Sequence, residues 1–147
     1  MEYTVKVDRE GTVRYYKPGT ELLHREDGPA VVWKYGAKQW YREGKRHRED
    51  GPAETEPNGY EAWYQDGKHH REDGPALVCS TGSKSWYQHG MLHREDGPAI
   101  ECSDGRMRWY LDNKELSEAE FKERMDKAQV RTFKVPTDTT QIRIQLE

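Results

Sequence analysis

One seven-residue string, His-Arg-Glu-Asp-Gly-Pro-Ala, occurs four times in the chain, each copy 23 residues after the last. The copies begin at His24, His47, His70 and His93. A Trp-Tyr pair recurs at the same step, as Trp40-Tyr41, Trp63-Tyr64, Trp86-Tyr87 and Trp109-Tyr110. A fixed period of this length is typical of a repeat protein, in which each unit packs only on its neighbours. The chain is therefore expected to form one small unit about five times in a row.

Each period carries two hairpin signals. One is a glycine-containing pair such as Tyr35-Gly36 or Asn58-Gly59, and the other is a pair such as Glu43-Gly44 or Asp66-Gly67. Asn-Gly and Asp-Gly pairs favour two-residue type I′ turns, and short β-prone segments lie between them. The Gly-Pro of each string predicts a kink in the returning strand. The pattern indicates a mainly β, elongated antiparallel meander with two strands per repeat and at least nine strands.

The turn positions predict a register and two different faces. With Tyr35-Gly36 as a two-residue loop, Val31 lies opposite Trp40, and across the second hairpin Trp40 lies opposite His47. The same count places Leu77, Ile100 and Glu54 opposite Trp86, Trp109 and Trp63. One face would then hold the structural repeat residues, the four Trp and four His named above, with aliphatic neighbours. The other would hold the tyrosines beside small alanines, as a shallow trough with free hydroxyl groups.

The fifth copy differs in sequence from the earlier copies at its end. Leu116 stands where the earlier copies have His, and Ser117 with Glu120 forms a capping box. Leu116 and Phe121 have the spacing of a hydrophobic staple. The sequence predicts a β-repeat array over residues 1–116, a short capping helix over 117–129, and a C-terminal tail over 130–147 with a strand at 142–146.

Composition limits the classes of partner and the compartment. Lys plus Arg is 24 and Asp plus Glu is 27, a near balance that argues against a dedicated nucleic-acid or anionic-membrane binder. No apolar run approaches about 20 residues, and the first ten residues lack the apolar core of a secretory signal. Two cysteines, Cys79 and Cys102, are too few for a disulfide scaffold. These features favour a cytoplasmic protein.

The repeated His, Arg, Glu and Asp do not resemble a chemical site. Equivalent residues of successive repeats are two strands apart, about 9–10 Å, whereas zinc–nitrogen bonds are about 2 Å. Catalysis needs unlike environments within one site, and four similar copies are the opposite. We therefore predict packing of each imidazole on its Trp, and no catalytic residue, metal or cofactor.

The string from Tyr41 to His47, aromatic-x-x-Gly-Lys-x-His, recurs from Tyr64 to His70 and resembles MORN repeats over roughly residues 12–116. The HREDGPA form is similar to the divergent MORN variants of bacterial antitoxin-like and phage proteins. It departs from the family where His-Gly-x-Gly becomes His-Arg-Glu-Asp-Gly-Pro. The resemblance implies an elongated, twisted single sheet that binds other proteins along a face or groove, with membrane-surface contact or self-association in some members.

These observations predict a non-catalytic protein-interaction module, antitoxin-like or a phage-encoded inhibitor. Its partner protein would contact the tyrosine trough, which comprises Tyr41, Tyr64, Tyr87 and Tyr110. The alternative is a nucleotide or nucleic-acid binding, sequestering protein that uses the aromatic ladder for stacking. Unprotected strand edges at residues 1–9 or 142–146 also favour a homodimer.

Overall fold

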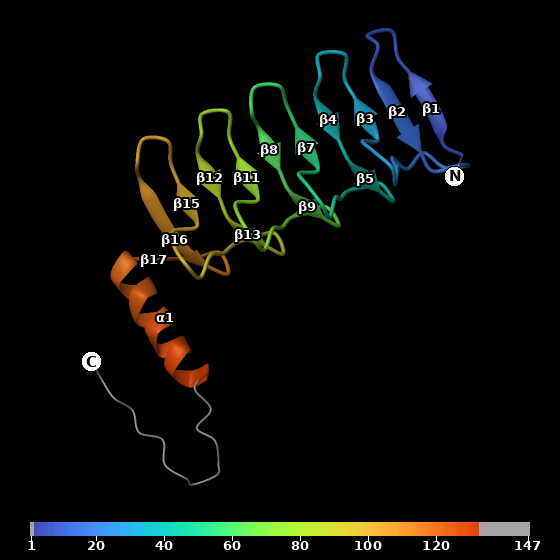
Figure 1. The fold of residues 1–147 in the computed structure, drawn as a ribbon. Coiled ribbons are helices and arrows are strands. Elements are labelled where there is room, and N and C mark those ends of the chain that lie inside the picture. Colours follow the sequence, from blue (N-terminus) through green and yellow to red (C-terminus); the bar gives the residue numbers. More distant parts are fainter. Residues whose placement is uncertain (1, 133–147) are drawn as a thin grey trace, which may run out of the picture.

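The computed structural model describes residues 2–132, which form a row of β-hairpins closed at one end by a helix (Figure 1). The described residues form seventeen strands and a single helix, so the expectation of a mainly β repeat array is confirmed. The tips of the larger hairpins line up along one edge of the row (Figure 1). Within residues 2–132, no helix is long and apolar enough to cross a membrane.

Eleven strands form one antiparallel sheet that runs the length of the array. Its order follows the sequence, so neighbouring repeats lie side by side. The strands, in order, are β1 (Thr4–Val7), β2 (Val13–Tyr16), β3 (Val31–Val32), β4 (Lys38–Gln39), β7 (Glu54–Thr55), β8 (Glu61–Ala62), β11 (Leu77–Val78), β12 (Lys84–Ser85), β15 (Ile100–Glu101), β16 (Met107–Leu111) and β17 (Lys114–Leu116).

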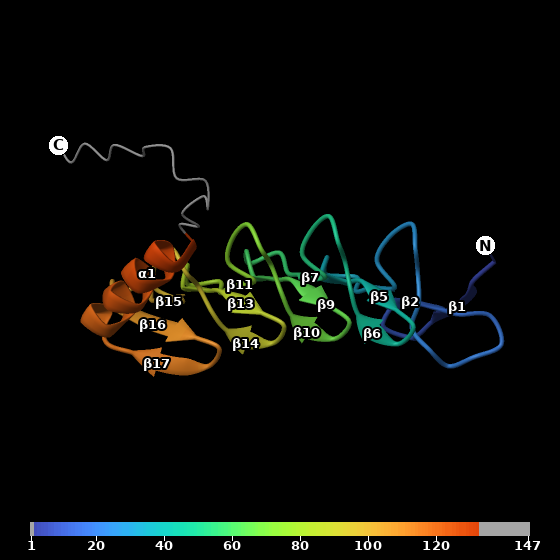
Figure 2. The same ribbon diagram turned by 90° about the horizontal axis from the view of Figure 1, so that it is seen from below.

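The remaining strands form three separate two-stranded ribbons, which lie in a row in Figure 2. They are β5 (Tyr41–Arg42) with β6 (Lys45–Arg46), β9 (Tyr64–Gln65) with β10 (Lys68–His69), and β13 (Tyr87–Gln88) with β14 (Met91–Leu92). The prediction of two hairpins per period is thus confirmed. The expected two strands per repeat form the main sheet, and each ribbon is an addition to it, because the chain leaves the main sheet at Trp40, Trp63 and Trp86.

The departure at each tryptophan is visible in its hydrogen bonds. The Trp40 N–H donates to the carbonyl of Ala53 at 2.7 Å, whereas its carbonyl accepts from the His47 N–H at 3.1 Å. The partner of the chain therefore changes at this residue from the main sheet to the ribbon. The same bond to His47 confirms the predicted pairing of Trp40 with His47.

The two kinds of hairpin use different turns. In the ribbons the central residues both have positive φ, as in Glu43 (51°) and Gly44 (77°), which fits the predicted type I′ turn. In the main sheet the Trp33 N–H donates to the carbonyl of Ala37, which leaves three residues in the loop. Only the last of these, Gly36, has a positive φ, 105°, so a type I turn is followed by a left-handed glycine. The predicted two-residue loop is wrong here.

The extra loop residue shifts the register by one. Val31 lies opposite Gln39, not Trp40. Leu77, Ile100 and Glu54 likewise pair with Ser85, Arg108 and Ala62 instead of the predicted Trp86, Trp109 and Trp63. Because side chains alternate between faces, this slip moves the aliphatic residues from the tryptophan side to the tyrosine side.

The core consequently lies on the tyrosine side. Its central cluster is Ala53, Ala62 and Tyr64, with Trp40, Tyr60 and Leu77 packed against it. The four alanines that follow the prolines are fully buried, namely Ala30, Ala53, Ala76 and Ala99. Their carbonyls accept hydrogen bonds from the amides of Tyr15, Trp40, Trp63 and Trp86. The predicted placement of these alanines opposite the tyrosine that follows each Trp is therefore wrong.

The helix α1 (Glu118–Thr132) closes the C-terminal end and contacts β16 and β17. Its capping box is confirmed, because Ser117 Oγ accepts from the Glu120 N–H at 3.1 Å and Glu120 Oε2 accepts from the Ser117 N–H at 3.0 Å. Leu116 and Phe121, the predicted staple, are both buried. The helix extends beyond residue 129, so the first three residues of the predicted tail are helical. The predicted strand at 142–146 lies outside the described residues.

Candidate interaction surface

Four loops of identical sequence, here called the HREDGP loops, each precede a main-sheet strand, and the last three of them follow a ribbon. They comprise residues 24–29, 47–52, 70–75 and 93–98. In the second loop the guanidinium of Arg48 lies over the Trp40 ring, with Cζ 4.1 Å from the ring centroid. Its Nε donates to Asp50 Oδ1 at 3.0 Å and its Nη1 donates to the Pro52 carbonyl at 3.1 Å. One arginine thus holds both its own loop and the neighbouring indole in place.

The other three loops repeat this arrangement. Their arginines lie 3.9–4.0 Å from the centroid of an aromatic ring: Arg25 over Tyr15, Arg71 over Trp63 and Arg94 over Trp86. Each arginine also donates to the aspartate two residues on and the proline carbonyl four residues on. Cation–π contacts of this kind are worth about 0.5–1 kcal/mol at exposed sites.

The glycine of each loop makes room for this guanidinium. A Cβ atom placed on Gly51 would lie 2.6 Å from Arg48 Cζ, closer than non-bonded carbon atoms approach. The corresponding distances in the other loops are 2.9–3.0 Å. These four glycines are not among those with positive φ, so a larger residue here would act mainly by displacing the guanidinium.

The repeated histidines join one repeat to the next. His47 Nδ1 accepts a hydrogen bond from the backbone N–H of Asp66 at 3.0 Å, and His24 Nδ1 accepts from Glu43 at 2.9 Å. His70 and His93 do the same toward His89 and Asp112. Because Nδ1 is the acceptor, the ring proton is on Nε2, which faces a loop glutamate, 3.4 Å away in the case of Glu49. These contacts give the histidines a structural role, and the packing of each imidazole on its Trp stays a prediction.

The carboxylates of the loops face solvent. The side chain of Glu49 is 73% exposed and that of Asp50 is 87% exposed, and the other loops are similar. Hydrogen bonding from the loop arginine lowers the pKa of Asp27, Asp50 and Asp73 below its ordinary value of 3.8. Each loop therefore presents two negative charges against one arginine, and the row of loops carries an excess of negative charge.

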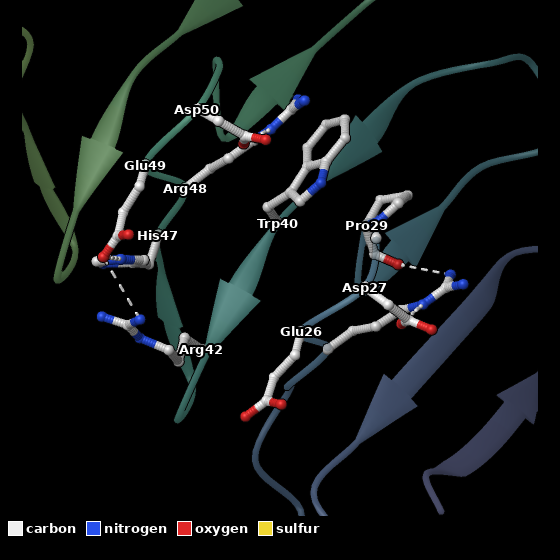
Figure 3. A pocket seen from close by; sticks show the side chains of 11 residues that line it. Glu26, Asp27, Pro29, Trp40, Arg42, His47, Arg48, Glu49 and Asp50 are labelled. Atoms are coloured by element: carbon white, nitrogen blue, oxygen red, sulfur yellow. Dashed lines mark hydrogen bonds and ion pairs between the residues drawn. The ribbon is translucent and has the colours of Figure 1, made fainter. Parts of the chain in front are cut away.

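Grooves lie between successive loops. Groove 1, between the first and second loops, has a volume of about 780 Å³, and groove 2, between the third and fourth, about 860 Å³. In Figure 3, Trp40 stands in groove 1 with Arg48 on one side and Pro29 on the other. Acidic side chains of both loops, among them Glu26 and Glu49, complete the walls (Figure 3). Trp86 has the corresponding position in groove 2.

The two grooves differ in charge. The lining of groove 1 includes three arginines and four carboxylates, and that of groove 2 includes one arginine and five carboxylates. Part of the difference is that Arg42 in groove 1 is replaced by Gln88 in groove 2. Asp112, from the turn of the last repeat, adds a carboxylate to groove 2. Groove 2 is therefore the more negative of the two.

The tyrosines do not form the exposed trough that the sequence predicted. Tyr64 and Tyr110 are each only 8% exposed, and Tyr41 and Tyr87 are half-buried. His69 stacks on both Tyr64 and Tyr87, with centroid distances of 4.1 and 5.0 Å. Burial raises the pKa of Tyr64, Tyr87 and Tyr110. The expectation of an exposed tyrosine face is wrong, because the register slip places the aliphatic residues beside the tyrosines.

Trp40, Trp63 and Trp86 lie beside the HREDGP loops. Trp40, Trp63, Trp86 and Trp109 are half-buried, and the first three are covered on one ring face by arginine. The sequence offered one signal for this surface: its longest repeated string consists mostly of charged residues, which belong in solvent. Cys79 and Cys102 are free thiols and half-buried, as predicted. Across residues 2–132, no group of three or more His, Cys, Asp or Glu side chains could hold a metal ion.

Compared with known proteins, the chain matches no family model, and no curated protein sequence matches it. Its function is therefore inferred from the loops, grooves and charges described above.

Proposed function

We propose that this protein is a non-catalytic protein-interaction module of MORN-like repeats, and that its partner protein binds along the HREDGP loops. The observation that carries the proposal is the pair of grooves in which Trp40 or Trp86 stands between walls of exposed carboxylates. In line with the resemblance to divergent MORN variants, the module acts in the cytoplasm as an antitoxin-like or phage-encoded inhibitor.

The composition of this surface suits a protein partner. Tryptophan and arginine are the residues enriched at binding hot spots, and interfaces combine an aromatic centre with a polar rim. Arg48 is already held over Trp40 by three contacts, so little side-chain freedom is lost when a partner covers it. The tyrosines are not proposed as contact residues, because Tyr64 and Tyr110 lie in the interior.

A nucleotide or nucleic-acid partner is less well supported. The loops that flank each indole carry Glu and Asp side chains that face solvent, and their charge repels phosphate groups. An enzymatic role is also less well supported, because four loops with the same residues in the same contacts provide no unlike pair of acid and base groups.

The proposal is tested by comparing two variants of equal net charge. The first replaces the four loop glutamates by glutamine: Glu26, Glu49, Glu72 and Glu95. The control replaces four exposed glutamates elsewhere: Glu2, Glu10, Glu61 and Glu118. Both are tagged, checked for wild-type melting temperature, and used to capture partners from the cytosol of the source cell. A partner protein retained by the wild type and the control but lost by the loop variant supports the proposal. Equal capture by both variants contradicts it.

A further inference from the structure

We propose, on the basis of the proposed function above, that the partner presents a cationic segment in the polyproline II conformation, with Lys or Arg at every third residue. The segment runs along the array, keeps the period of the repeats, and places cationic side chains in groove 1 and groove 2. Three observations carry this inference: the spacing of the grooves, their charge, and the aromatic ring in each described groove.

The spacing selects the conformation of the ligand. Successive repeats in the main sheet are two strands apart, or about 9.4–9.8 Å, and grooves 1 and 2 lie two repeats apart. A polyproline II helix has three residues per turn and rises about 3.1 Å per residue, so the same side of the helix recurs every 9.3 Å or so. Side chains at every third position therefore keep the period of the repeats, and those six positions apart reach groove 1 and groove 2 together.

Other regular conformations do not match this spacing. In an extended strand the side chains on one side recur at about 6.6–6.8 Å, so alternate side chains would meet the loops instead of the grooves. In an α-helix two turns advance about 10.8 Å, which adds an error of about 1 Å at each groove. Only the polyproline II repeat agrees with the groove spacing to within a few tenths of an ångström.

The charge of the grooves selects cationic side chains. Carboxylates outnumber arginines in both linings, and groove 2 has five carboxylates against one arginine. A Lys or Arg side chain that enters such a groove meets carboxylates from the loops on both sides. The long methylene stem of these residues also suits the aromatic ring of Trp86.

The aromatic ring in each described groove also suits a polyproline II ligand. Polyproline II ligands dock on grooves lined by aromatic side chains, because their conformation is preformed and loses little entropy on binding. Trp40 and Trp86 recur at the positions where such a ligand would contact the array. Prolines between the cationic residues would therefore fix the conformation, while the stems of the cationic side chains contact the indoles in the grooves.

The central test uses two peptides of identical composition and the full-length protein. One has four repeats of arginine-proline-proline, and the other has a block of four arginines followed by eight prolines. Fluorescence anisotropy at about 50 mM and 200 mM salt gives the dissociation constants. The proposal expects the spaced peptide to bind at least tenfold more tightly and to weaken as salt increases. Equal affinities for both peptides would overturn the spacing argument, and binding of neither would overturn the inference as a whole.

Two single substitutions test where the cationic side chains go. Gln88→Arg gives groove 2 the residue of groove 1 and should weaken binding of the spaced peptide by about twofold to fivefold, the effect of one exposed charge pair. Arg42→Gln makes the reverse exchange in groove 1 and should strengthen binding by a similar factor. Because Gln88 Nε2 also donates to the Arg71 carbonyl, the two variants are interpreted together. Unchanged affinity in both would place the peptide outside the grooves.

The outcomes separate this inference from the proposed function. If the cellular partner is captured and is lost by the four-glutamate loop variant, while neither peptide binds, the proposed function stands and the polyproline II inference fails. A single-stranded oligonucleotide serves as a third ligand in the same assay. Its binding, with displacement by salt and no peptide binding, would contradict both.

Discussion

His47 Nδ1 accepts a hydrogen bond from the backbone N–H of Asp66, which lies nineteen residues further along the chain, at 3.0 Å. Asp66 is the first central residue of the ribbon turn in the next repeat, with φ of 48°. The imidazole of one repeat therefore fixes the turn of the next, and all four repeated histidines make this contact. In an array whose core consists largely of alanines, such contacts carry much of the coupling between neighbouring repeats.

Replacing His47 by leucine should lower the free energy of unfolding by about 1–3 kcal/mol, because the Asp66 N–H loses its partner in a part-buried position. Leucine preserves the bulk of the side chain and is the residue that the fifth copy uses, at Leu116. Urea denaturation followed by tryptophan fluorescence measures the change. His93→Leu provides a graded comparison, since the His93 side chain is 17% exposed against 7% for His47, and should cost less. An unchanged midpoint for His47→Leu would contradict the coupling role.

The ribbons and the helix cap could be predicted from the sequence, because each depends on residues close together in the chain. Asp66-Gly67 supplies two adjacent positive-φ residues, which is sufficient for a two-residue turn. Ser117 and Glu120 bond only to one another's backbone. The pairing of Trp40 with His47 follows directly from the turn between them.

The faces of the sheet could not be predicted, because they depend on the number of residues in the other turn. A single left-handed glycine such as Gly36 occurs in both two-residue and three-residue loops. The glycine alone therefore does not determine how many loop residues precede it. A difference of one residue in the length of the loop decides whether Val31 lies on the same face of the sheet as the tryptophans or as the tyrosines. The contact of Arg48 with Trp40 was also not predicted, since it joins residues of one repeat across a loop whose path depends on the register.

The Arg48 guanidinium should be displaced by a methyl group on Gly51. Gly51→Ala places a Cβ at 2.6 Å from Arg48 Cζ, and because the guanidinium can move away, the free energy of unfolding should fall by only about 0.5–1 kcal/mol, the value of an exposed cation–π contact. Loss of the contact over the Trp40 ring should also change the fluorescence of the folded protein. Chemical denaturation and emission spectra measure the two effects.

A double-mutant cycle tests whether the collision with Arg48 causes the loss of stability in Gly51→Ala. In an Arg48→Ala background the same Gly51→Ala substitution should cost much less, because the atom with which the methyl group collides has been removed. An equal cost in both backgrounds would show that the glycine is required for another reason.

Acid should weaken the fold partly through His69, which stacks between Tyr64 and Tyr87. Burial lowers the pKa of His69 from its ordinary value of 6.5. The unfolded chain then binds a proton at a higher pH than the folded chain, so stability is present above about pH 6.5 and is lost as the pH falls toward the lowered pKa. Denaturation at pH 7.5 and pH 5.5 should show a smaller loss in His69→Phe, which retains a ring in the stack. Identical losses in the variant and the wild type would contradict a lowered pKa.

The first strand should support self-association. β1 is the terminal strand of the eleven-stranded sheet, and Val5 and Val7 are exposed on it. Within residues 2–132 its outer edge has no partner strand, and such edges pair with other chains. Sedimentation velocity at high micromolar concentration should detect a dimer, and Val5→Lys should shift it to monomer by placing a charge at the edge. A monomeric wild type under these conditions would contradict this prediction.

Tyr64 and Trp86 should respond oppositely to truncation. Tyr64 is 8% exposed and belongs to the central alanine cluster, so Tyr64→Ala should lower the free energy of unfolding by about 3–5 kcal/mol. Trp86 is half-buried in groove 2 and is covered by Arg94 on one ring face. Trp86→Ala should cost only about 1–2 kcal/mol in stability, the sum of a cation–π contact and a partly buried ring, yet abolish partner capture. Denaturation curves and titrations on both variants check this pair. If Trp86→Ala unfolds the protein while Tyr64→Ala leaves it folded but unable to bind, the tyrosine side would be the interaction surface after all.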